Sequence, residues 1–63
     1  MYAKYVELRD MKGVNDATVA KATNIPPSTF SDWKTGKSKP KIEKLLKIAE
    51  YFGIPVGELI AKQ

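Results

Sequence analysis

The fold of this 63-residue chain is decided by residues 15–36, which read NDATVAKATNIPPSTFSDWKTG. This stretch predicts two short helices joined by a tight turn, the arrangement called a helix-turn-helix. Asn15 is suited to cap the first helix, because its side chain can accept a hydrogen bond from an unpaired N–H group of the first turn. Asn24 is suited to end it, because Asn tolerates the left-handed conformation that commonly closes a helix. Pro26 then caps the second helix, which we expect over residues 27–35.

The side chains of the second helix divide into an inner and an outer set. Ile25 and Phe30 stand at the two positions of a hydrophobic staple, and Trp33 lies one turn after Phe30, so we expect all three in the core. The outer set is short and mostly hydroxylic: Ser28, Thr29, Ser31, Asp32 and Thr35. Such a face can hydrogen-bond base edges or phosphates from the major groove, or it can be an ordinary solvated helix face.

The composition limits the chain to one small domain held together by apolar packing. It contains no Cys and no His, which leaves no disulfide and argues against a zinc site. No apolar run approaches the roughly 20 residues that a membrane span needs, and the N-terminus lacks the apolar segment of a signal peptide. We therefore expect a single domain over residues 1–63 in the cytoplasm, with no metal, no cofactor and no membrane contact.

The positive charge is concentrated in one segment. The formal net charge is +4, from 11 basic and 7 acidic residues. One glutamate, Glu43, stands among six lysines, so this segment carries a net charge of +5: Lys34, Lys37, Lys39, Lys41, Lys44 and Lys47. Such a cluster is typical of a surface that binds a polyanion, or of a lysine-rich surface that keeps a protein soluble. Its place beside a helix-turn-helix favours nucleic acid.

Three further helices are expected around this unit, which makes the fold class all-α with five helices. The first spans about residues 2–12 and ends at Gly13, with apolar residues at helical spacing: Tyr2, Tyr5, Val6, Leu8 and Met11. A fourth helix, opened by Pro40 and ended by Gly53, carries an amphipathic stripe: Ile42, Leu45, Leu46, Ala49 and Phe52. A short fifth helix carries Val56, Leu59 and Ile60.

Arg9 has two possible uses in this arrangement. It can pair with an acidic side chain such as Glu50, or it can reach a phosphate. We favour the structural pairing, because the arginine fork is best used against a carboxylate.

With these helices and turn residues, the chain resembles the lambda-repressor-like helix-turn-helix family, the Cro and Xre type of phage and bacterial regulators. The resemblance covers nearly the whole chain, and its most specific part is residues 29–40, TFSDWKTGKSKP. Outside that part it rests on these residues: Arg9, Gly13, Val19, Ala20, Ile25, Ser28, Leu45, Leu46, Ala49, Gly53, Ile54 and Leu59.

The resemblance implies a compact five-helix domain whose third helix is the recognition helix. It implies that the residues facing base edges are Pro27, Ser28, Ser31 and Asp32. It implies that the DNA backbone lies near Asn15, Asp16, Thr29, Thr35, Lys37, Lys39 and Lys41. Pro27 stands where the family often carries a long polar reader, which implies an apolar contact, as with a thymine methyl group. Asp32 can accept a hydrogen bond from a cytosine amine or pair with Lys34 or Lys37.

The leading hypothesis is a sequence-specific binder of double-stranded DNA, a phage or bacterial transcriptional regulator and more specifically a repressor. A module this small reads few bases, so we expect a homodimer on a palindromic operator with half-sites about one helical turn apart. Val56 and Leu59 are expected to close the core of the monomer. Ile60 suits the core and a dimer surface equally well.

Two other classes of function compete with this hypothesis. A protein-interaction module, such as an antitoxin or a coactivator domain, can use the same fold without reading bases. An enzyme is rejected, because the chain has no His, no Cys and no Gly-rich phosphate loop, and because Ser28 and Ser31 have no visible base to activate them. No small-molecule substrate is therefore expected.

Overall fold

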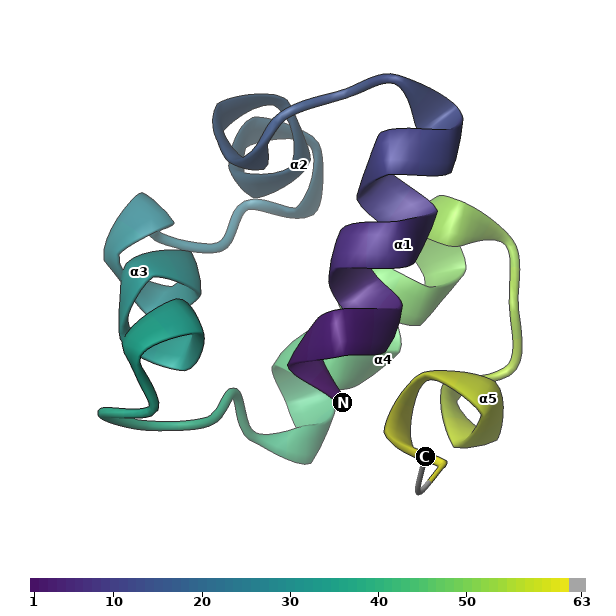
Figure 1. The fold of residues 1–63 in the computed structure, drawn as a ribbon. Helices are drawn as coiled ribbons and strands as arrows, with labels where there is room; N and C mark the ends of the chain where they lie inside the picture. The colour runs from purple at the N-terminus through teal and green to yellow at the C-terminus, as the bar shows by residue number, and fades with distance from the viewer. Residues whose placement is uncertain (62–63) are drawn as a thin grey trace.

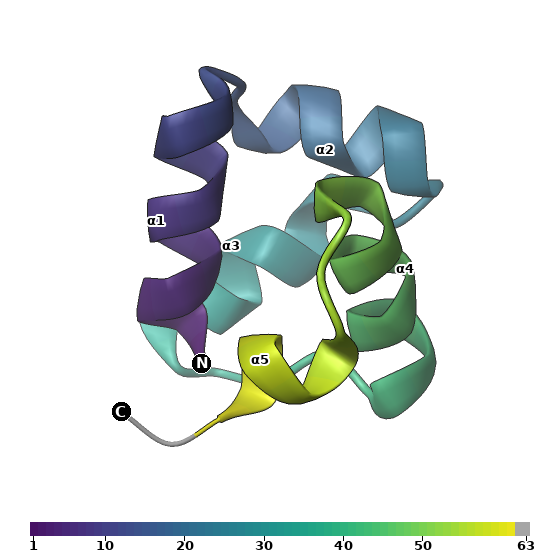
Figure 2. The ribbon, with the colours of Figure 1, turned by 90° about the vertical axis from the view of Figure 1, so that its right-hand side faces the viewer.

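Five helices follow one another along residues 1–61, which are the residues that the computed structural model describes. They are α1 (Tyr2–Lys12), α2 (Asp16–Thr23), α3 (Pro27–Thr35), α4 (Ile42–Phe52) and α5 (Val56–Ile60). The described residues contain no strand, so the all-α prediction with five helices is confirmed. Figure 1 shows α2 and α3 on one side of the molecule, with α1, α4 and α5 on the other. Figure 2 shows this second side, where α5 lies at the lower end of the molecule next to α4.

No helix in the described part of the chain is long and apolar enough to cross a membrane.

The turn between α2 and α3 forms as its residues predict. Asn24 adopts the left-handed conformation, with φ of 59° and ψ of 35°, and it is the only non-glycine residue of the described chain with positive φ. The N–H group of Ile25 then donates to the carbonyl oxygen of Ala20 at 3.0 Å. This bond turns the chain sharply, and the side chain of Ile25 is buried directly after the turn. The start of α3 at Pro27, with Pro26 as its cap, is confirmed as well.

The start of α4 differs from the prediction. Pro40 does not open the helix, because α4 begins at Ile42 and Lys41 occupies the cap position in an extended conformation. Pro40 is instead a buried residue of the loop before the helix. Its fixed φ angle and missing N–H group suit an irregular loop as well as a helix start, so the sequence alone did not separate these two uses.

Tyr5 is the centre of an aromatic cluster that connects α1 with α3 and α4. Its ring is fully buried and lies 5.2 Å from that of Trp33, 5.3 Å from that of Phe30 and 6.1 Å from that of Phe52, measured between ring centroids. Phe30 and Trp33 are both buried, as predicted. Packed aromatic pairs of this kind add to the free energy gained by burying the rings themselves. The inner face of α3 is therefore fixed by α1.

The apolar stripe of α4 was predicted only in part. Leu45 and Ala49 are buried as expected, but Ile48 is fully buried and was not predicted. Ile42 and Leu46 remain 52% and 49% exposed. At about 100° per residue, Ile48 lies on the same face as Leu45 and Ala49, whereas Ile42 and Leu46 lie at its edge. On α1, Met11 is likewise outside the core, with 79% of its surface exposed.

We predict that Trp33→Ala strongly destabilises the domain. The substitution leaves a cavity beside Tyr5 and removes a ring packed against it, and truncating a buried Trp typically costs about 3–5 kcal/mol. Chemical denaturation followed by circular dichroism measures this change. Leu46→Ala is the matched control, because it removes a large side chain from a half-exposed position and should cost much less. A Trp33→Ala protein as stable as the parent would place Trp33 outside the core.

Candidate nucleic-acid interface

The outer face of α3 presents the residues that were predicted to face DNA bases. Pro27, Ser28 and Ser31 are exposed, and Asp32 is half-buried. They lie on the outside because the 3.6-residue period of the helix turns the buried Phe30 toward the core and leaves its polar neighbours facing out. The face is therefore accessible, short and polar, and its contact with bases stays a prediction.

The loop after α3 is fixed to the last turn of that helix. The backbone N–H groups of Lys37 and Ser38 donate to the carbonyl oxygen of Asp32, at 2.9 and 3.3 Å. The hydroxyl of Thr35 donates to the same oxygen at 3.2 Å. These bonds set the position of the first loop lysine relative to α3, and Lys39 follows it on the exposed surface.

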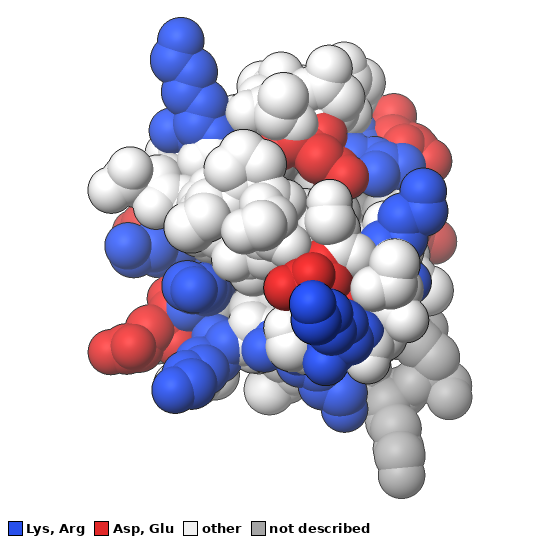
Figure 3. All heavy atoms as spheres, turned by 90° about the vertical axis from the view of Figure 1, so that its left-hand side faces the viewer, with Lys and Arg blue, Asp and Glu red and all other residues white. Residues whose placement is uncertain are grey.

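The lysines of the segment from Lys34 to Lys47 have no acidic partner among residues 1–61. The ion pairs formed in this part of the chain involve two cations of α1, Lys4 with Glu7 and Glu58, and Arg9 with Asp10 and Asp16. Figure 3 shows the side of the molecule that carries α2 and α3, with mostly uncharged and a few acidic side chains in its centre and basic side chains gathered over its lower part. The positive charge of the lysines from Lys34 to Lys47 is therefore available to an external polyanion.

The cap of α2 offers an exposed donor, and the first residue of the helix carries a bonded carboxylate. The side-chain oxygen of Asn15 accepts hydrogen bonds from the backbone N–H group and the hydroxyl of Thr18, at 2.8 and 2.9 Å. Its Nδ2 group makes no hydrogen bond to the residues described in this structure. Asp16, the next residue, is bonded to α1 through its carboxylate. Two residues predicted to lie near the DNA backbone thus differ in what they can offer it.

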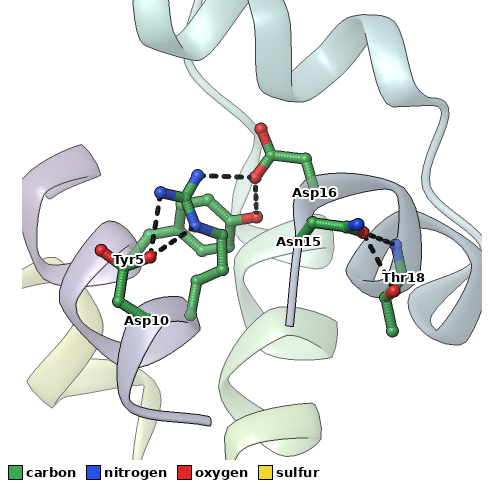
Figure 4. A network of polar contacts seen from close by, with 6 residues as sticks. Tyr5, Asp10, Asn15, Asp16 and Thr18 are labelled. Atoms are coloured by element: carbon green, nitrogen blue, oxygen red, sulfur yellow. Dashed lines mark hydrogen bonds and ion pairs between the residues drawn. The ribbon is translucent and has the colours of Figure 1, made fainter. Parts of the chain in front are cut away.

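The carboxylate of Asp16 is shared by two side chains of α1 (Figure 4). Its Oδ1 atom accepts from the hydroxyl of Tyr5 at 2.5 Å and from Nη1 of Arg9 at 3.0 Å. The bond to Asp16 is the main cause that raises the pKa of Arg9, and the bond to Asp10 raises it further. Burial is the main cause that raises the pKa of Tyr5, with the bond to Asp16 second.

The structural pairing of Arg9 is confirmed, but its predicted partner is wrong. Arg9 binds Asp16 and Asp10 rather than Glu50. The bond from Tyr5 to Asp16 was not predicted at all. Tyr5 and Asp16 can each be recognised in the sequence as polar side chains. Whether they meet depends on the turn at Gly13, which sets how the start of α2 lies against α1. No local pattern signals that contact.

The apolar residues of α5 separate into inner and outer positions. Leu59 is fully buried and Val56 is half-buried against the core, as expected for residues that close the monomer. Ile60 is 43% exposed and is thus available as a candidate for a dimer surface.

Comparison with known proteins places this geometry among regulators. A family model described as helix-turn-helix matches residues 7–59. The cryptic phage CTXphi transcriptional repressor RstR of Vibrio cholerae is 29% identical over 59 residues, which cover 94% of this chain and 53% of the relative. The crystal structure of a transcriptional regulator from Listeria innocua is similar, with a TM-score of 0.78 and 28% sequence identity. The matched region covers all of this chain and 60% of the Listeria innocua chain. The chain spans between about half and three fifths of the length of these proteins.

The raised pKa of Tyr5 predicts a loss of stability in base. The ordinary pKa of tyrosine is 10.0. Above that pH the unfolded chain releases the proton while the native state retains it, so the contribution of Tyr5 is complete below about pH 10 and decreases as the pH rises further. We expect the free energy of unfolding of the parent to fall more steeply above pH 10 than that of Tyr5→Phe, by up to about 1.4 kcal/mol per pH unit. Denaturant unfolding at pH 8 to 11.5 measures both slopes, and equal slopes would contradict the prediction.

Proposed function

Because this chain belongs to the Cro/Xre-type helix-turn-helix family of DNA-binding transcriptional regulators, we propose that it is a repressor whose α3 enters the major groove of an operator. The observation that carries this proposal is the exposed hydroxylic face of α3 beside lysines that have no acidic partner among residues 1–61. Base contacts give sequence preference, while cations beside the helix bind phosphates and fix its position. The name of the Vibrio cholerae relative supports repression rather than activation.

We assign base reading to the first turns of α3. Ser28 and Ser31 carry short hydroxyls, so α3 must lie close to the base edges for these groups to reach them. Asp32 can accept a hydrogen bond from a cytosine amine, and Pro27 can offer an apolar edge to a thymine methyl group. The exposure of this face supports the assignment.

We assign the DNA backbone to groups at three places. Thr29 lies within α3, and four residues lie at its end and in the connection to α4: Thr35, Lys37, Lys39 and Lys41. Asn15 caps the start of α2, and its Nδ2 group can donate to a phosphate oxygen. Asp16 lies beside it, but its carboxylate is already bonded to α1, which supports an indirect role.

We further propose that two copies bind a palindromic operator. One recognition helix reads few base pairs, and a symmetric pair on half-sites about 34–36 Å apart multiplies the specificity. Ile60 is the candidate for the contact between the two copies, because it is the exposed large apolar residue of α5. The proposed domain spans residues 1–63, of which Lys62 and Gln63 lie outside the described residues, and we place it in the cytoplasm with the DNA that it binds.

Selection of bound sites from a random duplex library tests this function. We expect the parent to select a two-fold repeated site, and we expect Ser31→Ala and Asp32→Ala each to change the preferred base at one position of each half-site. About 1–3 kcal/mol depends on each good base contact. Ser38→Ala is the matched control, since it removes a hydroxyl from the loop rather than from α3. If both α3 variants select the parental site, this face does not read bases, and a protein-interaction module becomes the better hypothesis.

Loss of a backbone lysine should weaken binding to every sequence alike. We expect Lys37→Ala and Lys39→Ala each to reduce the slope of log K against log salt by about 0.9, the value for one phosphate contact on B-DNA. Fluorescence anisotropy with the selected site and with random duplex, over a series of salt concentrations, measures this slope. Lys4→Ala removes the same charge from the ion pairs of α1 and should leave the slope unchanged. Parental slopes in both loop variants would place these lysines away from the backbone.

A further inference from the structure

The first residue of α2 brings a negative charge to the proposed DNA backbone contact. Asp16 directly follows Asn15, and 38% of its side chain is exposed. An acidic residue in the first turn stabilises the helix, because it compensates the positive end of the helix dipole. The same charge repels a phosphate group that approaches Asn15. A regulator that uses this end of α2 therefore has to compensate the charge of Asp16 by a cation that stays in place.

Arg9 has the contacts that such a cation requires. Its Nη1 atom donates to Oδ1 of Asp16 at 3.0 Å, while Nε and Nη2 both bind Oδ1 of Asp10 at 3.1 Å. The guanidinium carbon also lies 5.9 Å from the centroid of the Tyr5 ring. The hydroxyl of Tyr5 adds a second donor to the same oxygen of Asp16. The carboxylate of Asp16 is thus bonded to two side chains of α1, and the guanidinium of Arg9 is bonded to two carboxylates.

We propose that Arg9 is a positioning residue for DNA binding, which acts through Asp16. Arg9 neutralises the carboxylate and, together with Tyr5, holds it against α1, so that the start of α2 can approach a phosphate without repulsion. This inference rests on the proposed function, since it concerns the backbone contact at Asn15. The side chain of Arg9 is only about one fifth exposed. The proposal gives it an influence on affinity for DNA that does not require Arg9 itself to contact the DNA.

A purely structural role for Arg9 makes a different prediction about rescue. If Arg9 only connects α1 to α2, the loss of its partner Asp16 cannot restore what the loss of Arg9 removed. If Arg9 compensates a charge, a neutral residue at position 16 makes the compensation unnecessary. The double substitution therefore separates the two roles, provided that affinity is compared among proteins that are equally folded.

The test is a double-mutant cycle with Arg9→Gln, Asp16→Asn and the two combined, measured by anisotropy on the selected duplex and on random duplex. Unfolding curves of each variant give its folded fraction at the assay temperature. We expect Arg9→Gln to weaken binding to both duplexes about fivefold at low salt, as for one uncompensated charge near a phosphate. The loss should shrink as salt screens the repulsion. The combined variant should return to within about twofold of the parent.

The control and the second variant keep each outcome decisive. Lys4→Gln removes the same charge from α1, but Lys4 pairs with Glu7 and Glu58 and not with Asp16, so this variant should not change affinity. If Arg9→Gln does not fold, Asp16→Asn alone still tests the proposal, because it should bind DNA at least as tightly as the parent. Weaker binding by folded Asp16→Asn, or equal losses in Arg9→Gln and the combined variant, overturns the inference while the proposed function stands. A parent protein that binds no duplex DNA overturns both.

Discussion

The burial of Tyr5 is the constraint on which the rest of the structure depends. Its ring packs against α3 and α4, and its hydroxyl needs a hydrogen-bond acceptor inside the protein because water does not reach it. Asp16 supplies that acceptor from α2. One side chain of α1 thus sets the distance to three other helices. Apolar packing and this hydrogen bond are satisfied together only when α2 and α3 keep one fixed position relative to each other.

Most of the local structure could be predicted from the sequence, because it depends on residues close together in the chain. Asn15 caps α2, Asn24 ends it and Pro27 starts α3, each through its own backbone or side-chain chemistry. The division of α3 into an aromatic inner face and a hydroxylic outer face follows from the helical period alone. For this reason the outer face of the candidate site, and the basic loop after it, could be named before the structure was known.

The parts that could not be predicted depend on contacts between distant segments. Whether Ile48 or Leu46 enters the core is decided by where α2 and α5 meet α4, and both residues suit a helix equally well. Pro40 satisfies the rules for a helix start and for a loop. The partner of Arg9 lies across the turn at Gly13, where sequence spacing gives no distance. The proposed reading of bases by α3 could not be derived from the fold either, since it depends on a molecule other than the protein.

Some charged side chains of this protein form ion pairs and others do not, and this difference also affects how the protein approaches a polyanion. The acidic residues Asp10 and Asp16 are compensated by a cation of α1, whereas the lysines of the α3–α4 connection keep their charge uncompensated. A group of uncompensated positive charges therefore lies in the connection that follows α3. In the field of a polyanion such a molecule turns before it touches, so a larger fraction of diffusional encounters begins with the correct face. We expect the ion pairs of α1 to favour association as well, because they compensate acidic charge that would repel a polyanion.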